Sequence, residues 1–281
     1  MKSLSMMIFP ACGGVCAAGW YGFHSLQPKD LKEYLEWQGF QLASSDNSWK
    51  AVIKEHGELA KSIEVQSESD LEKLKSWCAS HLPLSDFSSH IDKAAKLCVD
   101  NVGTVEAKLV RDGISVDIFF QESSGDEKYK TAYVFRKHNS DFLSLIGHTP
   151  EEEEDFEPAV SKYKAWCEST LKAKPETSLF ENFKLFCKPK SFSTVRSYLD
   201  TFKLQYLTED SSGGLKDMWG KIKEFASYQQ DIQDTKSDES DLRKWCEDNL
   251  KKNFHEGMKV FDDILKKVKA RCTKGSEVVD S

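Results

Sequence analysis

The stretch LKSWCASHL at residues 74–82 recurs as YKAWCESTL at residues 163–171 and as LRKWCEDNL at residues 242–250. Each copy contains a Trp-Cys pair, with a lysine one or two positions before it and a leucine four positions after the cysteine. Tryptophan and cysteine are rare residues, so chance does not explain three such matches in one chain. Self-similarity at a fixed period is typical of repeat architectures. The sequence therefore predicts three tandem units.

The similarity between the copies extends in both directions. Upstream, LEWQGFQL at residues 35–42 resembles LVRDGISV at 109–116 and LDTFKLQY at 199–206. A polar, serine-rich turn follows in each copy, and then an aromatic residue that opens a basic, apolar stretch: Trp49, Tyr129 and Trp219. Downstream, each copy has one more cysteine. We predict an N-terminal segment at residues 1–28 and repeat units at residues 29–100, 101–190 and 191–281, the last ending in a tail.

The pattern within one unit is mainly helical. Leu71, Leu74, Trp77 and Cys78 lie on one face of a helix that opens with the capping-box sequence SDLE at residues 69–72. A second amphipathic helix is expected over residues 85–98. The exception is residues 105–120, where β-branched residues flank Asp112-Gly113 and predict a hairpin. A short extended segment after a helix that ends at a glycine, as at Gly39, explains the stretch equally well.

The N-terminal segment has the character of a membrane or targeting sequence. No residue from Ser3 to Pro28 is charged, and residues 6–23 are almost wholly apolar or small, behind a single Lys2. This length is at the lower edge of a helix that spans a bilayer, and the layout is that of a signal peptide. Since no clean cleavage site follows, we expect an uncleaved anchor through residues 3–28. The bulk of the chain is then expected outside the cell.

Composition excludes several classes of protein. The chain has 281 residues, 39% hydrophobic and 30% charged, with only 7 proline residues. This predicts a packed fold and excludes collagen-like, low-complexity and polytopic membrane chains. The formal net charge is −7, which argues against a nucleic-acid partner, because proteins bind phosphates by neutralising them with basic residues.

Six cysteines are divided two to each unit: Cys78 and Cys98, Cys167 and Cys187, and Cys246 and Cys272. One disulfide in each unit would account for the even number, and it would indicate a compartment outside the reducing cytosol. In a simple helical hairpin with its turn near Pro83, however, the two sulfurs would not face each other. The pairing therefore stays open, and buried, reduced cysteines beside tryptophan are an equal alternative. No metal site is expected, because His81 has no counterpart in the other copies.

No motif for catalysis or cofactor binding is present. The chain lacks a phosphate-binding loop, a dinucleotide fingerprint, a zinc-protease motif and a nucleophile elbow. The repeated aromatic residues are interpreted as core positions, since such residues at helical spacing are more often core than ligand platform. These are Trp49, Trp77, Tyr129, Trp166, Trp219 and Trp245. We expect neither an enzyme nor a cofactor.

The whole pattern resembles the large paralogous protein families of haemotropic mycoplasmas. The resemblance extends from Leu31 to Cys246 and depends on the Leu-x-x-x-Gly-Phe-x-Leu stretch, the Ser-Ser-Asp turn, the Trp-Lys helix and the Lys-x-Trp-Cys-x-x-x-Leu helix behind an apolar N-terminus. Lys203 in place of glycine and Tyr129 in place of tryptophan depart from it. The resemblance implies a bacterial parasite of red cells with divergent candidate surface antigens, and it implies no catalytic or ligand-binding residues.

Two functional hypotheses follow. The first is a membrane-anchored helical repeat protein displayed outside the cell, which takes part in host interaction or antigenic variation. Its partner would be a host or cell-surface protein. The second is an intracellular scaffold that is tethered to the membrane by its N-terminus and whose cysteines are reduced.

Overall fold

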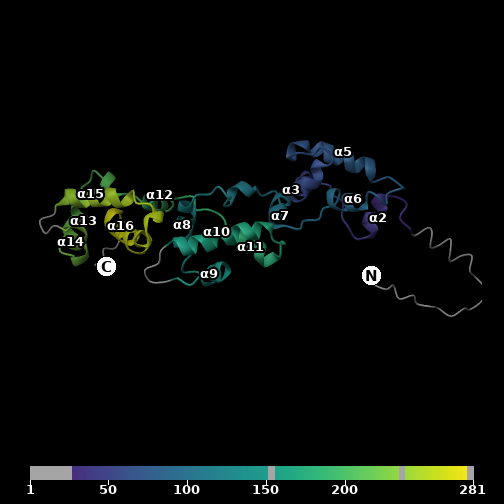
Figure 1. Cartoon of the computed structure of the whole chain (residues 1–281). Helices are drawn as coiled ribbons and strands as arrows, with labels where there is room; N and C mark the ends of the chain where they lie inside the picture. The colour runs from purple at the N-terminus through teal and green to yellow at the C-terminus, as the bar shows by residue number, and fades with distance from the viewer. Residues whose placement is uncertain (1–26, 151–155, 234–237, 277–281) are drawn as a thin grey trace, which may run out of the picture. The chain divides into compact units, whose positions relative to one another are not determined.

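The computed structural model describes residues 27–150, 156–233 and 238–276. Over these ranges the chain is mainly helical and contains no strand, only three isolated β-bridges (Figure 1). None of the helices in these ranges is long and apolar enough to cross a bilayer. Residues 3–26 of the predicted membrane segment lie outside the described part of the chain.

The first repeat packs short helices around one apolar core. Its elements are α2 (Leu31–Trp37), α3 (Asp46–Glu55), α4 (Gly57–Lys61), a 3₁₀ turn η1 (Glu68–Asp70), α5 (Leu71–His81) and α6 (Ile91–Leu97). The core includes Leu35, Trp49, Leu74 and Leu97. Helices of this length are marginal alone in water, so this shared core stabilises them.

The second and third repeats contain α-helices in the same order, whereas their short turns lie at different places. The second contains α7 (Val105–Arg111), η2 (Val116–Ile118), α8 (Asp126–Val134), α9 (Ser140–Ile146), α10 (Phe156–Lys172) and α11 (Thr177–Phe186). The third contains α12 (Val195–Asp200), η3 (Leu207–Glu209), α13 (Gly214–Ile222), α14 (Ala226–Ile232), α15 (Glu239–Leu250), η4 (Phe254–Glu256), a π-helical turn η5 (Val260–Ile264) and α16 (Leu265–Cys272). The Trp-Cys motifs lie on α5, α10 and α15.

The hairpin predicted near residues 105–120 is wrong. Residues 105–111 form helix α7, which is capped by the Thr104 side chain and buries Val105, Ala107 and Leu109. Asp112-Gly113 ends this helix and does not connect two strands: Gly113 has φ +75° and its N–H donates to the Val110 carbonyl. The alternative, an extended segment after a glycine-terminated helix, describes the chain correctly.

Two details of the predicted helices are also corrected. The capping box at residues 69–72 does not form, because Asp70 makes no side-chain cap at α5 and the Ser67 side chain caps η1 instead. The helix expected over residues 85–98 is the shorter α6, and Phe87 lies in the loop before it. The C-terminal tail does not include Thr273, since Thr273 is buried and its Oγ1 donates to the Lys269 carbonyl.

A left-handed residue ends the first helix of every repeat. Gly39 has φ +87°, Gly113 has φ +75° and Lys203 has φ +56°. After it, a short extended segment pairs with the chain beside the last cysteine of the repeat. The Ala43 N–H donates to the Cys98 carbonyl at 3.0 Å, and the Phe120 N–H donates to the Cys187 carbonyl at 2.8 Å. In the third repeat the same pairing is the bridge between Tyr206 and Thr273.

The substitution Lys203→Gly is expected to stabilise the chain by about 0.5–1 kcal/mol, because a side chain with a Cβ pays a steric cost in the left-handed region. Gly39→Ala is expected to destabilise the chain by about 1 kcal/mol for the same reason. No other atom would contact the added methyl group, so the cost comes from the positive φ of residue 39 alone. Urea unfolding of each variant measures both values. Lys216→Gly, inside α13, is the control and should lower stability by about 1 kcal/mol; a loss of stability in Lys203→Gly would contradict the argument.

The chain forms two compact units, Met1–Ile114 and Ser115–Ser281. Helix α7 therefore belongs to the first unit, where it packs on α3. The Glu55 carboxylate explains this packing: it accepts hydrogen bonds from the N–H groups of Gly103 and Thr104 and from the Thr104 hydroxyl, at 2.9 to 3.3 Å. A Cβ at position 103 would lie 2.8 Å from Glu55 Oε1, so a larger residue there would displace this carboxylate.

Candidate functional site

The six cysteines of the repeats form one disulfide within each repeat. The bonded pairs are Cys78–Cys98, Cys167–Cys187 and Cys246–Cys272, each with 5.7 Å between the Cα atoms. Contrary to the expectation for a simple helical hairpin, Cys78 and Cys98 do meet, because α6 does not begin at the turn near Pro83. The loop of residues 82–90 comes first, and the end of α6 then meets the last turn of α5.

The repeated aromatic residues lie in or beside the core. Trp49 and Tyr129 are buried, whereas Trp219 and the tryptophans of the three Trp-Cys pairs, Trp77, Trp166 and Trp245, are half-buried. Trp77 stacks on His81 at 4.2 Å between ring centroids, and Trp166 meets the edge of the Phe186 ring. The Arg271 guanidinium lies 5.2 Å from the Trp245 ring centroid. These contacts are packing contacts, and the tryptophans do not converge on a cavity.

The second and third repeats share an aromatic cluster inside the second unit. Phe135, at the end of α8, lies 4.6 to 5.0 Å between ring centroids from four aromatic residues of the third repeat: Phe192, Tyr198, Phe254 and Phe261. Next to it, Lys137 Nζ forms an ion pair with Asp262 at 2.5 Å. This junction places side chains from three segments of the chain around one space.

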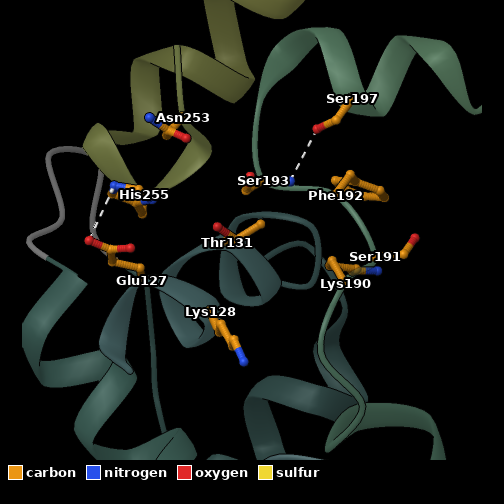
Figure 2. Close-up of a pocket in the computed structure, with 10 residues that line it drawn as sticks. All are labelled: Glu127, Lys128, Thr131, Lys190, Ser191, Phe192, Ser193, Ser197, Asn253 and His255. Atoms are coloured by element: carbon orange, nitrogen blue, oxygen red, sulfur yellow. Dashed lines mark hydrogen bonds and ion pairs between the residues drawn. The ribbon is translucent and has the colours of Figure 1, made fainter. Parts of the chain in front are cut away.

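That space is a pocket of about 380 Å³. It is lined by Glu127, Lys128 and Thr131 of α8, by residues 190–193 of the segment before α12 together with Ser197 of α12, and by Asn253 and His255 at η4 (Figure 2). In Figure 2, Glu127 and His255 lie on one side of Thr131, and Lys190 and Ser191 lie on the other. Nine of the ten lining residues are polar or charged, and Phe192 is the aromatic one.

Charge is distributed unequally across the pocket. On one side His255 Nε2 lies 3.8 Å from Glu127 Oε1. On the other side Lys190 is half-buried, with its Nζ 5.5 Å from the centroid of the Phe135 ring. Burial, together with the positive charge of nearby Arg136, lowers the pKa of Lys190. The pocket therefore has a positive side at Lys190, and Glu127 and His255 lie on its other side.

Arg136 is the buried cation beneath the positive side. Its guanidinium donates hydrogen bonds to the Tyr163 hydroxyl and to the carbonyl oxygens of Leu185 and Lys188, and no carboxylate is among these partners. Burial lowers the pKa of Arg136, and burial likewise raises the pKa of Tyr163. Both shifts express the cost of a charge that is surrounded by neutral groups.

The Ser197 hydroxyl and the His255 imidazole of the lining both have neighbours within the protein. The Ser197 hydroxyl accepts hydrogen bonds from the N–H groups of Ser193 and Thr194 and donates to the Thr194 carbonyl, so its role is to cap α12. His255 Nε2 lies 3.8 Å from a carboxylate oxygen of Glu127, so its neighbour is an acidic group and not a hydroxyl nucleophile. Among the described residues, no group of three or more histidine, cysteine or acidic side chains is placed to hold a metal ion.

The sequence did not identify the pocket. Its lining residues come from three segments, and none of them belongs to the Trp-Cys signature. The stretch Lys190-Ser-Phe-Ser193 resembles an ordinary linker between repeats, so only the contacts of Phe135 with the third repeat reveal its role. No protein-family model, curated protein or solved structure shows significant similarity to this chain.

Proposed function

We propose that this protein is a membrane-anchored protein of three helical repeats, displayed outside the cell, that takes part in host interaction or antigenic variation and does not catalyse a reaction. The predicted apolar segment at residues 3–28 would be its anchor. The resemblance to paralogous families of haemotropic mycoplasmas supports the same proposal. The observation that carries it is the disulfide within each repeat. Disulfides persist in oxidising environments and are rare where thiols are kept reduced.

The distribution of these disulfides fits an exposed protein. Each repeat consists of short helices with long connections, which expose much backbone to proteases. A disulfide that closes a loop of 20 to 26 residues adds about 3 kcal/mol by restricting the unfolded chain. Three such bonds would keep the core positions fixed while solvent-facing positions on helices and loops are free to vary, as antigenic variation requires.

Digestion of intact cells with a membrane-impermeant protease tests this location. Mass spectrometry should show that peptides between Lys29 and Ser281 are lost from intact cells. Thiols are alkylated during lysis under denaturing conditions without reductant, and digestion should then yield three cross-linked peptide pairs and no alkylated Cys78 or Cys98. Peptides from a cytosolic protein are the control for cell integrity.

The alternative function, an intracellular membrane-tethered scaffold, predicts the opposite result in both measurements. Its peptides would survive until lysis, and all six cysteines would be alkylated. The cysteines are small and fully buried, so they would also fit the core in the reduced state. Survival of the peptides together with alkylated cysteines would therefore replace the first proposal by the second.

A further inference from the structure

Two cations at the junction of the second and third repeats lack an acidic partner. Among the described residues, neither Lys190 nor Arg136 forms an ion pair: Lys190 lies over the Phe135 ring, and the hydrogen bonds of Arg136 go to a hydroxyl and to carbonyl oxygens. Charges that are partly removed from water are costly unless they are paired. Lys190 lines the adjacent pocket, so an anion bound there would supply its missing partner.

The other charged groups of the pocket strengthen this asymmetry. Lys128 is exposed on the lining and forms no ion pair within the described ranges. Glu127 is the acidic residue of the lining, and it lies on the opposite side of Thr131 from Lys190, near His255 (Figure 2). The anionic group of a ligand at Lys190 would therefore lie across Thr131 from the Glu127 carboxylate.

The neutral part of the lining indicates what else the ligand contains. Thr131, Ser191 and Ser193 provide hydroxyl groups, which both donate and accept hydrogen bonds. Phe192 provides an apolar ring against which a flat carbon face can pack. A volume of about 380 Å³ lies near the lower end of the range for small-molecule sites. These features together suit a small ligand with many hydroxyl groups.

We propose that the pocket between the second and third repeats binds a sugar-sized, polyhydroxylated anion, such as a sugar that bears a carboxylate or a phosphate group. The anionic group lies at Lys190, the hydroxyl groups meet Thr131 and Ser193, and the sugar ring lies against Phe192. This inference is independent of the side of the membrane on which the repeats lie, because a free sugar acid, a sugar phosphate and a terminal acidic sugar of a glycan share this chemistry.

Isothermal titration calorimetry of the full chain, purified with its disulfides intact, tests the proposal. Glucuronate and glucose 6-phosphate are the anionic probes, and glucose and inorganic phosphate are the matched controls. We expect at least one anionic probe to bind about tenfold or more tightly than both controls. Tighter binding of glucuronate favours a carboxylate ligand, and tighter binding of glucose 6-phosphate favours a phosphate ligand.

Two lysine variants separate binding from general effects on folding. Lys190→Met should weaken binding of the anionic probe by about tenfold or more, because a charge-assisted contact is lost. Lys190→Arg should keep binding within about threefold. Lys184→Met is the control: Lys184 is also half-buried and lies over an aromatic ring, Phe180, at 4.7 Å, but it does not line the pocket.

Thermal unfolding distinguishes a lysine that binds a ligand from one that only stabilises the fold. Lys190→Met relieves the repulsion from Arg136, so its melting temperature should be equal to or above that of the unaltered chain. The proposal is overturned if neither anionic probe binds, if glucose or inorganic phosphate binds as tightly as both, or if Lys190→Met and Lys184→Met bind alike. A lower melting temperature of Lys190→Met with unchanged binding would assign Lys190 to packing alone.

Discussion

The double substitution Cys78→Ala and Cys98→Ala is expected to lower the free energy of unfolding of the first unit by about 3 kcal/mol or more. The disulfide closes a loop of 20 residues, and both cysteines are fully buried, so the alanines also leave unfilled volume in the core. Urea unfolding followed by hydrogen exchange resolves the two units. Amides between residues 27 and 114 should lose protection, whereas those of the second unit should keep it.

Reduction provides the control for this result. Dithiothreitol should destabilise the first unit of the unaltered chain by a similar amount, and it should have no further effect on the first unit of the double variant. If the double variant unfolds at the same urea concentration as the unaltered chain, the disulfide contributes nothing to the stability of this repeat.

The substitution Phe254→Ala is expected to lower the stability of the second unit by about 3–5 kcal/mol. Phe254 is fully buried, and its ring contacts Phe135 of the second repeat as well as Tyr198 and Phe261 of the third. Removing it leaves a cavity where the two repeats meet. Hydrogen exchange should show faster exchange in both α8 and α12, since the cluster holds these segments together.

Phe202→Ala is the matched control for Phe254→Ala. Phe202 lies in the same unit and is 57% exposed, so its truncation should cost less than about 1 kcal/mol. Equal effects of the two substitutions would show that the junction has no particular energetic importance. Loss of protection that is confined to the third repeat would show that the two repeats unfold independently.

The sequence predicted the helical class because the apolar residues around each Trp-Cys pair follow a helical period. Leu71, Leu74 and Cys78 are all buried on one face of α5, as that period requires. The period is a property of neighbouring residues, so it can be found without tertiary structure. The hairpin predicted at residues 105–120 was wrong because β-strand propensity depends on tertiary contacts. The β-branched residues favour a strand locally, but packing on α3 stabilises α7 as a helix.

The disulfide pairing and the pocket depend on features that local patterns do not encode. The pairing of Cys78 with Cys98 requires the path of the loop of residues 82–90, which carries the chain away from α5 before α6 returns. The pocket requires Phe135 to pack on residues that lie 57 and more positions later in the chain, such as Phe192. Position 135 is equivalent to Glu55 of the first repeat, whose carboxylate accepts hydrogen bonds from the N–H groups of residues 103 and 104, just before α7. The equivalent position is acidic in the first repeat and aromatic in the second. The sequence shows this difference, but only the structure shows that Phe135 packs on the third repeat.

The packing of α7 on α3 has a consequence for how such chains can diversify. The sequence copies begin near residue 101, whereas the first folded unit ends at Ile114. Recombination between gene copies at residue 100 would give the new protein an α7 from another copy. That helix would not be matched to α3, and the hydrogen bonds from residues 103 and 104 to Glu55 could be lost. A crossover in the turn after Gly113 would transfer α3 and α7 together. Viable chimaeras should therefore have their junctions in that turn, one helix later than the sequence period suggests.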